Sequence, residues 1–337
     1  MLVIHIGTHK TGTSSLQSFL SARADALDLR GVHYLRSGRA AGKAHHELAW
    51  GVREHRGTDL SAWNEVRAEL AANSSLTSVI SSEAFWFTEP AGVKAQLGDL
   101  KDIRIVMYLR RQDKYLQSLY KQTVAGGRKL SFREWREKFQ YRGDYLSVVQ
   151  KWTAAFGKEA VTIRPYERAG KTIDVVADFV GLLDLDETGA LQRKKIGRNN
   201  PSPRRELMEM IRAFNQLEVN IDRNKFFYEV VARNEAYVRS NDLLTFEESV
   251  ALLREFEVGN RELIEESYHD PEPLFPALTR TEQPTIWSVD SDEYFALLVD
   301  MMDTVWKTAI ASVGDDRRGS RKEAKLRPKR NQHARNV

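Results

Sequence analysis

The chain has 337 residues, and its 42% hydrophobic and 29% charged content is typical of a soluble globular protein with enough apolar material for a core. It contains no cysteine, which excludes disulfides and thiolate metal sites. No segment approaches the roughly 20 apolar residues of a membrane span, and the apolar N-terminal run is too short for a signal peptide, so we expect a cytoplasmic protein.

The net charge of +4 comes from the C-terminal segment. Residues 317–337 hold nine Lys or Arg and one acidic residue, Glu323, and without them 42 basic and 46 acidic residues remain. Because this segment has almost no apolar content, we expect a basic disordered tail over 315–337. Such a tail is either solvated without a partner or weakly attracted to an anionic membrane surface or another polyanion. We expect no nucleic-acid partner.

Strand and helix patterns alternate over the first half of the chain. Residues 2–6 predict a short buried strand, a turn runs from Gly7 to Gly12, and a helix begins at Thr13. Further strands are predicted at 31–38, around 78–81, at 103–109 and at 160–165. Helices are predicted between them at 43–57, 61–75 (with Ser61 as N-cap), within 89–100, and at 112–125, 132–139 and 145–156.

The second half of the chain is predicted to be helical, at 172–183, 202–217, around 224–238, and at 246–268 and 291–313. Strands that alternate with helices over residues 1–167 predict an α/β fold with a doubly wound, mainly parallel sheet. We expect a single domain over 1–314, with the sheet core over about 1–185 and a helical C-terminal extension over about 186–314.

The turn after the first strand has the spacing of a phosphate-binding loop. Gly7 and Gly12 fit the pattern G-x-x-x-x-G-K-[ST], and Ser14 fits its last position. Backbone N–H groups and the helix dipole at such a helix N-terminus attract an anion. The lysine that reaches the terminal phosphates in ATP and GTP enzymes is replaced by Thr13. Lys10 lies inside the loop instead, where we expect it near the group attached to a single bound phosphate.

The run THKTGTSSL resembles the 5′-phosphosulfate-binding loop of the sulfotransferases that use 3′-phosphoadenosine 5′-phosphosulfate (PAPS), typically written P-K-S-G-T-T. The residues that carry this resemblance are Lys10, Thr11, Gly12, Thr13 and Ser14. It implies that they bind the donor. Lys10 would supply positive charge at the leaving oxygen, and no metal would be needed.

A second motif of these sulfotransferases is a strand that ends in arginine, with a serine eight residues later, both binding the 3′-phosphate of the donor. The run RIVMYLRRQDKYLQSLY resembles it, with Arg110 at the strand end and Ser118 in the next helix. A guanidinium and a helical hydroxyl can share one phosphate. Arg111 is adjacent but lacks the spacing.

The resemblance extends more loosely to about residue 270. It implies that Tyr166, in the run YER after the strand at 160–165, lies beside the adenine. Ser15 occupies the position where cytosolic members carry the aromatic residue that stacks on adenine, and we include it among the donor-binding residues. The R-K-G element that forms a third donor clamp has no clear match, and the candidates are Arg193, Lys194, Lys195 and Arg198.

A base is needed for the acceptor proton, and Glu83 follows the strand at 78–81 on the side where the loop opens. Its aromatic neighbours, residues 85–87, are expected to raise its pKa. Glu83 also resembles the glutamate base of carbohydrate (heparan-type) sulfotransferases. His45 and His46 are the alternatives, because cytosolic members use a histidine.

These observations predict a sulfotransferase that moves a sulfuryl group from PAPS to a hydroxyl of a small-molecule or glycan acceptor, favoured to be a saccharide or glycolipid, and releases 3′,5′-ADP. One alternative is a P-loop phosphotransferase that uses ATP–Mg²⁺, in which Glu83 would coordinate the Mg²⁺ ion. The other is a non-catalytic nucleotide-binding module. The aromatic residues 85–87, Trp50 and Trp63 could stack on a sugar or belong to the core.

Overall fold

We analysed a computed structural model of the chain. It describes residues 1–39, 42–52, 60–168, 170–193, 205–217, 222–233 and 243–280, together with 298, 299, 302–304 and 307. The chain forms two compact units. The first comprises Met1–Tyr120, Phe132–Gly197 and Leu244–Arg280, and the second comprises Lys121–Ser131, Arg198–Leu243 and Thr281–Val337. The predicted division near residue 185 stays a prediction, and the predicted tail over 315–337 lies outside the described residues.

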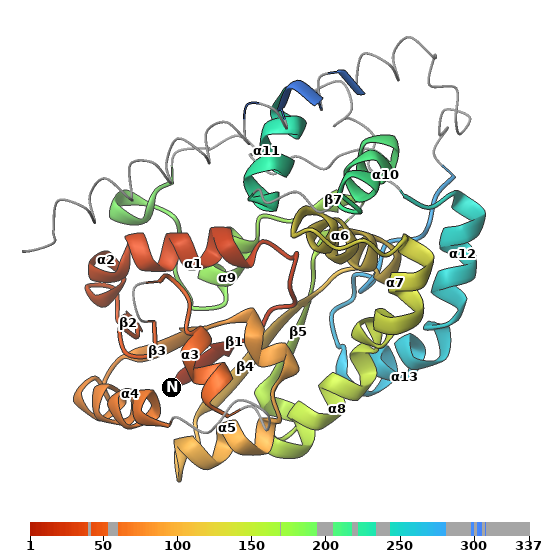
Figure 1. The fold of residues 1–337 in the computed structure, drawn as a ribbon. Helices are drawn as coiled ribbons and strands as arrows, with labels where there is room; N and C mark the ends of the chain where they lie inside the picture. The colour runs from red at the N-terminus through yellow and green to blue at the C-terminus, as the bar shows by residue number, and fades with distance from the viewer. Residues whose placement is uncertain are drawn as a thin grey trace, which may run out of the picture. The chain divides into compact units, whose positions relative to one another are not determined.

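The first unit is built on a five-stranded parallel sheet in the order β2-β3-β1-β4-β5 (Figure 1). Its strands are β1 (Leu2–His5), β2 (Val32–Tyr34), β3 (Thr77–Ser81), β4 (Ile103–Leu109) and β5 (Val161–Pro165). All five were predicted, and the predicted α/β class with a doubly wound parallel sheet is confirmed. A small antiparallel pair, β6 (Glu167–Arg168) with β7 (Lys171–Thr172), was not predicted.

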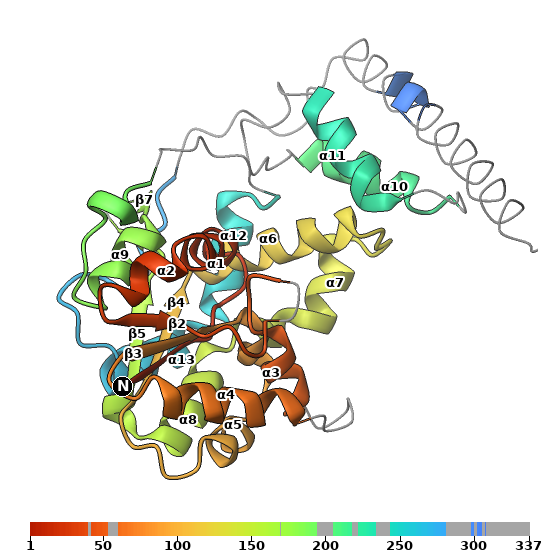
Figure 2. The same cartoon turned by 90° about the vertical axis from the view of Figure 1, so that its left-hand side faces the viewer.

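Helices cover both faces of this sheet (Figures 1 and 2). On one face lie α1 (Thr13–Ala22), α2 (Ala24–Asp28) and α9 (Val175–Gly181), and on the other α4 (Ser61–Ala72), α5 (Pro90–Leu97) and α8 (Tyr145–Phe156). The remaining helices of the unit are α3 (His46–Gly51), α7 (Phe132–Phe139), α12 (Phe246–Arg254), α13 (Glu257–Ser267) and the greater part of α6 (Gln112–Ala125). The core under α1 and α9 joins Val3, Val79 and Val106 to Leu16 and Phe179.

Two predicted helix boundaries are wrong. Ser61 is the first residue of α4 and not its cap, because Leu60 takes the cap position and no side chain caps the helix. The predicted helix at 246–268 is two helices, α12 and α13, with the Thr245 side chain capping the first. The predicted helix at 291–313 lies largely outside the described residues.

The second unit is helical where it is described. It contains α10 (Arg205–Phe214) and α11 (Arg223–Arg233), whose Phe214 and Phe226 rings have centroids 4.4 Å apart. The Asn215 side-chain amide donates to the backbone oxygens of Val124 at 2.8 Å and Arg128 at 3.0 Å. These bonds tie the C-terminal end of α6 to the segment after α10.

The sheet order positions the site. β1 has β3 on one side and β4 on the other, so the connections that leave β1 and β3 run in opposite directions. A reversal of this kind opens a crevice beyond the carboxyl ends of the central strands, where ligands bind in doubly wound sheets. The glycine-bounded loop after β1 starts at that point.

Candidate functional site

The loop from Ile6 to Gly12 is fastened to the end of β4. Backbone hydrogen bonds run from Tyr108 N–H to Gly7 O at 2.7 Å and from Thr8 N–H to Tyr108 O at 3.1 Å. The Thr11 hydroxyl donates to Thr8 O at 2.6 Å and closes the loop from inside. A Cβ added at Gly7, where φ is +100°, would lie 3.0 Å from the Glu83 Cβ. Glycine is therefore required where the loop passes the candidate base.

The N-terminus of α1 is open to an anion. Gly12 is the residue before the helix, with φ of +79°, no side chain caps the helix, and its first turn holds no acidic residue. The N–H groups of an uncapped first turn are available to a ligand. Thr13 is buried, whereas Ser14 and Ser15 are exposed in the first turn. The backbone thus has a glycine-bounded loop followed by an uncapped helix start, and phosphate binding there stays a prediction.

Arg110 and Tyr166 lie beside this helix N-terminus. The Arg110 guanidinium carbon is 5.4 Å from the centroid of the Tyr166 ring, and a Cβ at Gly12 would lie 3.8 Å from Tyr166 Cε2. Arg110 Nε is shielded from solvent, makes no hydrogen bond to the described residues, and is 3.5 Å from the Glu167 carboxylate. The structure thus brings together the loop, the strand-end arginine and the tyrosine named from sequence.

Lys10 stands at the mouth of the loop in the left-handed conformation, with φ of +65° and an exposed side chain. Desolvation by the surrounding protein lowers the pKa of its ammonium group, and the nearby Arg110 charge lowers it further. Lys10 and Arg110 therefore form one positive region.

The predicted donor residue Ser118 and the alternative arginine, Arg111, contribute less to this grouping. Ser118 is half-buried in α6, and no hydrogen bond within the described part of the chain joins it to Arg110. Arg111 is held elsewhere, because its guanidinium makes two bonds to Asp113, at 2.8 and 2.9 Å, and one to Pro276 O at 3.0 Å. The choice of Arg110 over Arg111 agrees with this geometry.

Of the candidates for a third donor clamp, Arg193 is the one within the described residues. Arg193 forms ion pairs with Asp174 at 2.6 Å and with Glu187 at 2.5 Å. A ligand phosphate would have to compete with both carboxylates. Lys194, Lys195 and Arg198 lie outside the described residues.

Glu83 begins the short helix η1 (Glu83–Phe87) just after β3, and its carboxylate accepts a hydrogen bond from Gln17 Nε2 at 2.7 Å. Burial raises the pKa of Glu83, but the Gln17 bond, its own backbone N–H and the charges of His46 and His9 outweigh burial and leave the pKa below its usual value. The predicted upward shift is wrong. Polar neighbours, not the aromatic residues that follow in sequence, dominate the surroundings of the carboxylate.

The two histidine alternatives have different roles. His45 is fully buried, accepts from Ser81 N–H at Nδ1 (3.1 Å) and donates from Nε2 to Leu35 O (3.0 Å), and burial lowers its pKa to about 4. Both ring nitrogens of His45 are therefore already hydrogen-bonded inside the protein. His46 is half-buried, bonds to Ser82 Oγ at 2.8 Å and stacks on Trp50. Of these two histidines, His46 is the one whose charge acts on the pKa of Glu83.

Three residues near Glu83 were not identified from the sequence. Gln17 is its hydrogen-bond donor. His9 stacks on Phe87 with ring centroids 5.5 Å apart, and burial lowers its pKa to about 4 despite the opposing charge of Glu83. The Arg142 guanidinium covers the same Phe87 ring at 4.9 Å. The place of His9 within the loop was the one local signal that could have found it.

The aromatic residues divide between core and site. Phe85, Trp86 and Trp63 are buried, and the Trp63 indole donates to Leu48 O at 3.1 Å. Phe87 is half-buried beside His9, and Trp50 is 40% exposed beside His46. Of the aromatic residues considered for stacking, only Phe87 and Trp50 keep exposed surface, Phe87 next to His9 and Trp50 next to His46.

No cluster of three or more His, Asp or Glu side chains within the described ranges could hold a metal ion. No helix in the same ranges combines the length and apolarity needed to cross a membrane.

The chain was compared with protein families, with curated proteins and with solved structures. No model of a protein family matches the chain. An uncharacterized protein of Archaeoglobus fulgidus is 32% identical over 173 residues, so the match covers 49% of this chain and about half, 46%, of that relative. The crystal structure of a sulfotransferase from Alicyclobacillus acidocaldarius aligns over 66% of this chain and 93% of its own, with 19% identity and a TM-score of 0.39. Neither similarity assigns this chain to a family.

Proposed function

We propose that the chain is a sulfotransferase that moves a sulfuryl group from PAPS to an acceptor hydroxyl, favoured to be on a carbohydrate or glycolipid, and releases 3′,5′-ADP. The observation that carries this proposal is that Arg110 and Tyr166 lie beside the uncapped N-terminus of α1, with Lys10 in the loop that precedes this helix. A cytoplasmic location is part of the proposal.

Each part of the donor has a candidate partner. The loop N–H groups and the exposed Ser14 hydroxyl would hold the 5′-phosphate, and Thr11 would contribute its N–H, because its hydroxyl already bonds to Thr8 O. Arg110, assisted by Ser118, would hold the 3′-phosphate. Tyr166 would lie against the adenine, with Ser15 at the edge of the same site.

The transfer step uses Glu83 and Lys10. The acceptor oxygen attacks the sulfur while the bond between sulfur and the bridging phosphate oxygen breaks. The proton of the acceptor hydroxyl passes to the Glu83 carboxylate, which its lowered pKa keeps ionised. The negative charge that develops on the leaving phosphate oxygen is stabilised by Lys10 and the loop N–H groups. No metal takes part in this scheme.

A transfer assay tests the proposal. The full chain would be incubated with radiolabelled PAPS and a panel of saccharide and glycolipid acceptors, and labelled product would be separated from free sulfate. Lys10→Met should lower turnover by about 10²- to 10³-fold, and Lys158→Met, at an exposed lysine away from the loop, should not. Phosphate transfer from ATP–Mg²⁺ without sulfuryl transfer would favour the phosphotransferase, and 3′,5′-ADP binding without turnover would favour the binding module.

A further inference from the structure

A second positively charged site lies at the far end of α1. A pocket of about 440 Å³ opens where the end of α1 meets α2 and the segment after β2. Its charged lining consists of Arg23, Arg36 and Arg39 with one carboxylate, Asp25. The volume is in the range of small-ligand sites, and three guanidiniums are suited to an oxyanion.

Two of these arginines have no acidic partner within the described residues. Arg36 is paired with Asp25 at 2.9 Å and Asp28 at 3.6 Å. Arg23 donates to the backbone oxygen of Gln192 at 3.3 Å, and Arg39 donates to Ser21 Oγ at 3.2 Å. The Nε atoms of Arg23 and Arg39 are shielded from solvent and make no hydrogen bond in the described part of the chain. Shielded Nε–H groups without an acceptor call for an explanation.

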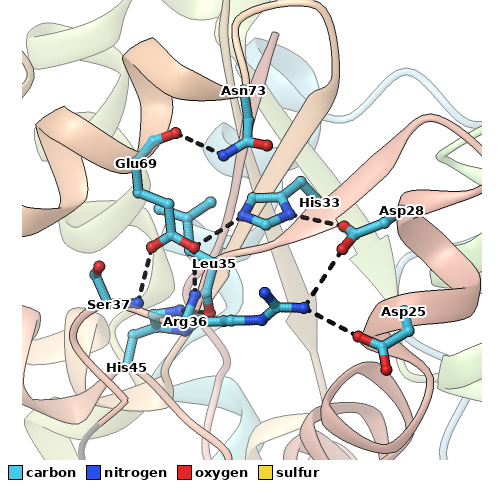
Figure 3. A network of polar contacts seen from close by, with 9 residues as sticks. All are labelled: Asp25, Asp28, His33, Leu35, Arg36, Ser37, His45, Glu69 and Asn73. Carbon is cyan, nitrogen blue, oxygen red and sulfur yellow. Dashed lines mark hydrogen bonds and ion pairs between the residues drawn. The ribbon is translucent and has the colours of Figure 1, made fainter.

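The segment that carries Arg36 is held in place before any ligand arrives (Figure 3). The Glu69 carboxylate accepts the N–H groups of Arg36 and Ser37, both at 2.8 Å, and contacts His33 Nε2 at 2.8 Å. The other ring nitrogen of His33 is 2.7 Å from Asp28, which also contacts Arg36. These bonds tie α2, β2 and α4 together, so the ordering cost on binding is reduced.

The same segment is packed tightly beyond Ser37. A Cβ at Gly38, where φ is +75°, would lie 2.6 Å from the Leu48 side chain. The Arg39 guanidinium carbon is 4.8 Å above the Tyr34 ring. Arg39 is therefore positioned by the strand end as well as by Ser21.

The pocket lies on the side of the loop opposite the proposed donor site. Arg110 and Tyr166 follow β4 and β5, whereas Arg36 and Arg39 follow β2, at the other end of the sheet order. Along α1, Lys43 donates to Ser18 Oγ at 3.2 Å, one helical turn before the Arg39 contact with Ser21. Because α1 rises about 1.5 Å per residue, the pocket is about 14 Å along the helix from the loop.

We propose that this arginine pocket binds an oxyanion, a sulfate or phosphate ester group, carried by the acceptor. That the anion belongs to the acceptor rests on the proposed function. That the pocket binds an anion rests on the pocket alone. It places the reactive hydroxyl at Glu83, beside Gln17 in the middle of α1, and an anionic group of the same molecule in the pocket at the end of that helix.

The test is calorimetric binding to the full chain with the donor site filled by 3′,5′-ADP. The probes are a sulfated disaccharide, the same disaccharide without sulfate, and a hexose 6-phosphate. The sulfated probe should bind at least about tenfold tighter than the unsulfated one. Arg23→Gln/Arg39→Gln should abolish this difference, and Arg67→Gln, at an exposed arginine on α4, should keep it. Preference for the hexose phosphate over the sulfated probe would identify phosphate esters as the better ligands of the same pocket.

The inference is overturned if sulfated and unsulfated probes bind equally and the phosphate is not bound, or if the double variant binds like the wild type. Retained 3′,5′-ADP binding and an unchanged unfolding temperature show that the double variant is folded. Failure of the wild type to bind 3′,5′-ADP would contradict the proposed function instead, and the probes would then be titrated into the unliganded chain, where loss of anion binding in the double variant is still expected.

Discussion

Burial and hydrogen bonding act in opposite directions on the Glu83 carboxylate. Desolvation favours its protonated form, and the Gln17 amide with the nearby His46 and His9 favours the ionised form. The second influence is the larger, so Glu83 is available as a proton acceptor at neutral pH. Its role in the mechanism is that of a positioned base with modest basicity.

Glu83→Gln should lower the rate of sulfuryl transfer by about 10²- to 10⁴-fold, because the amide cannot take the acceptor proton. Binding of 3′,5′-ADP should stay within about threefold of wild type, since the loop N–H groups and Arg110 are unchanged. Single-turnover kinetics and calorimetry measure the two effects separately. His46→Ala is the matched variant. If it abolished turnover while Glu83→Gln kept it, the base would be His46.

The pH dependence should report the Glu83 environment. Since the folded pKa of Glu83 lies below its usual value of 4.5, the acid limb of the activity profile should have its midpoint below that pH. Gln17→Ala removes a hydrogen bond that favours the charged form of Glu83. The pKa of Glu83 should therefore rise, and the acid limb of the kcat/KM profile should move to higher pH. An acid limb that did not move would mean that a different group controls it.

At the scale of elements, the loop after β1 has to pass the start of η1 at close range. Gly7→Ala should destabilise the fold by about 1–2 kcal/mol for its positive φ, with a further ~1–3 kcal/mol for the close approach to Glu83. Gly31→Ala is the matched control, because Gly31 has φ of +82° and open space around it. Denaturant unfolding of both variants isolates the contact with Glu83. Equal losses would show that the loop moves away at no cost.

The strands were easier to predict than the details of the site. The strand at 103–109 stands out because a continuous apolar run between polar segments marks a buried parallel strand, and the structure has it at those bounds. The short β6–β7 pair has no such run. Ser61 is a favoured capping residue, but no local pattern decides whether the helix begins before or at it.

Among the site residues too, those fixed by local sequence were predicted and those that depend on packing between distant elements were not. Lys10, Gly12 and Arg110 were identified because each has a fixed place relative to a strand end. Gln17 and Arg142 were not, since their approach to Glu83 and Phe87 depends on how α1 and the segment before α8 pack across the sheet edge. The sign of the Glu83 pKa shift was wrong for the same reason: neighbours in sequence, residues 85–87, were taken for neighbours in space.

At the scale of the whole molecule, the basic segment 317–337 is separable from the proposed chemistry. Truncation before Arg317 should leave 3′,5′-ADP binding and transfer rates within about twofold, because the sites described lie between residues 7 and 193. If the tail attracts anionic surfaces, co-sedimentation with phosphatidylserine vesicles at low salt should drop on truncation. Unchanged sedimentation would leave the segment as a solvated tail.

The central claim is that the loop after β1 and Arg110 together clamp a donor with two separate phosphates. Calorimetric titration of the full chain with 3′,5′-ADP, 5′-AMP and ATP–Mg²⁺ measures this directly. We predict that 3′,5′-ADP binds at least about tenfold tighter than either other nucleotide, and that Arg110→Gln removes its advantage over 5′-AMP. Tighter binding of ATP–Mg²⁺, or an Arg110→Gln variant that still distinguishes 3′,5′-ADP from 5′-AMP, would contradict the account.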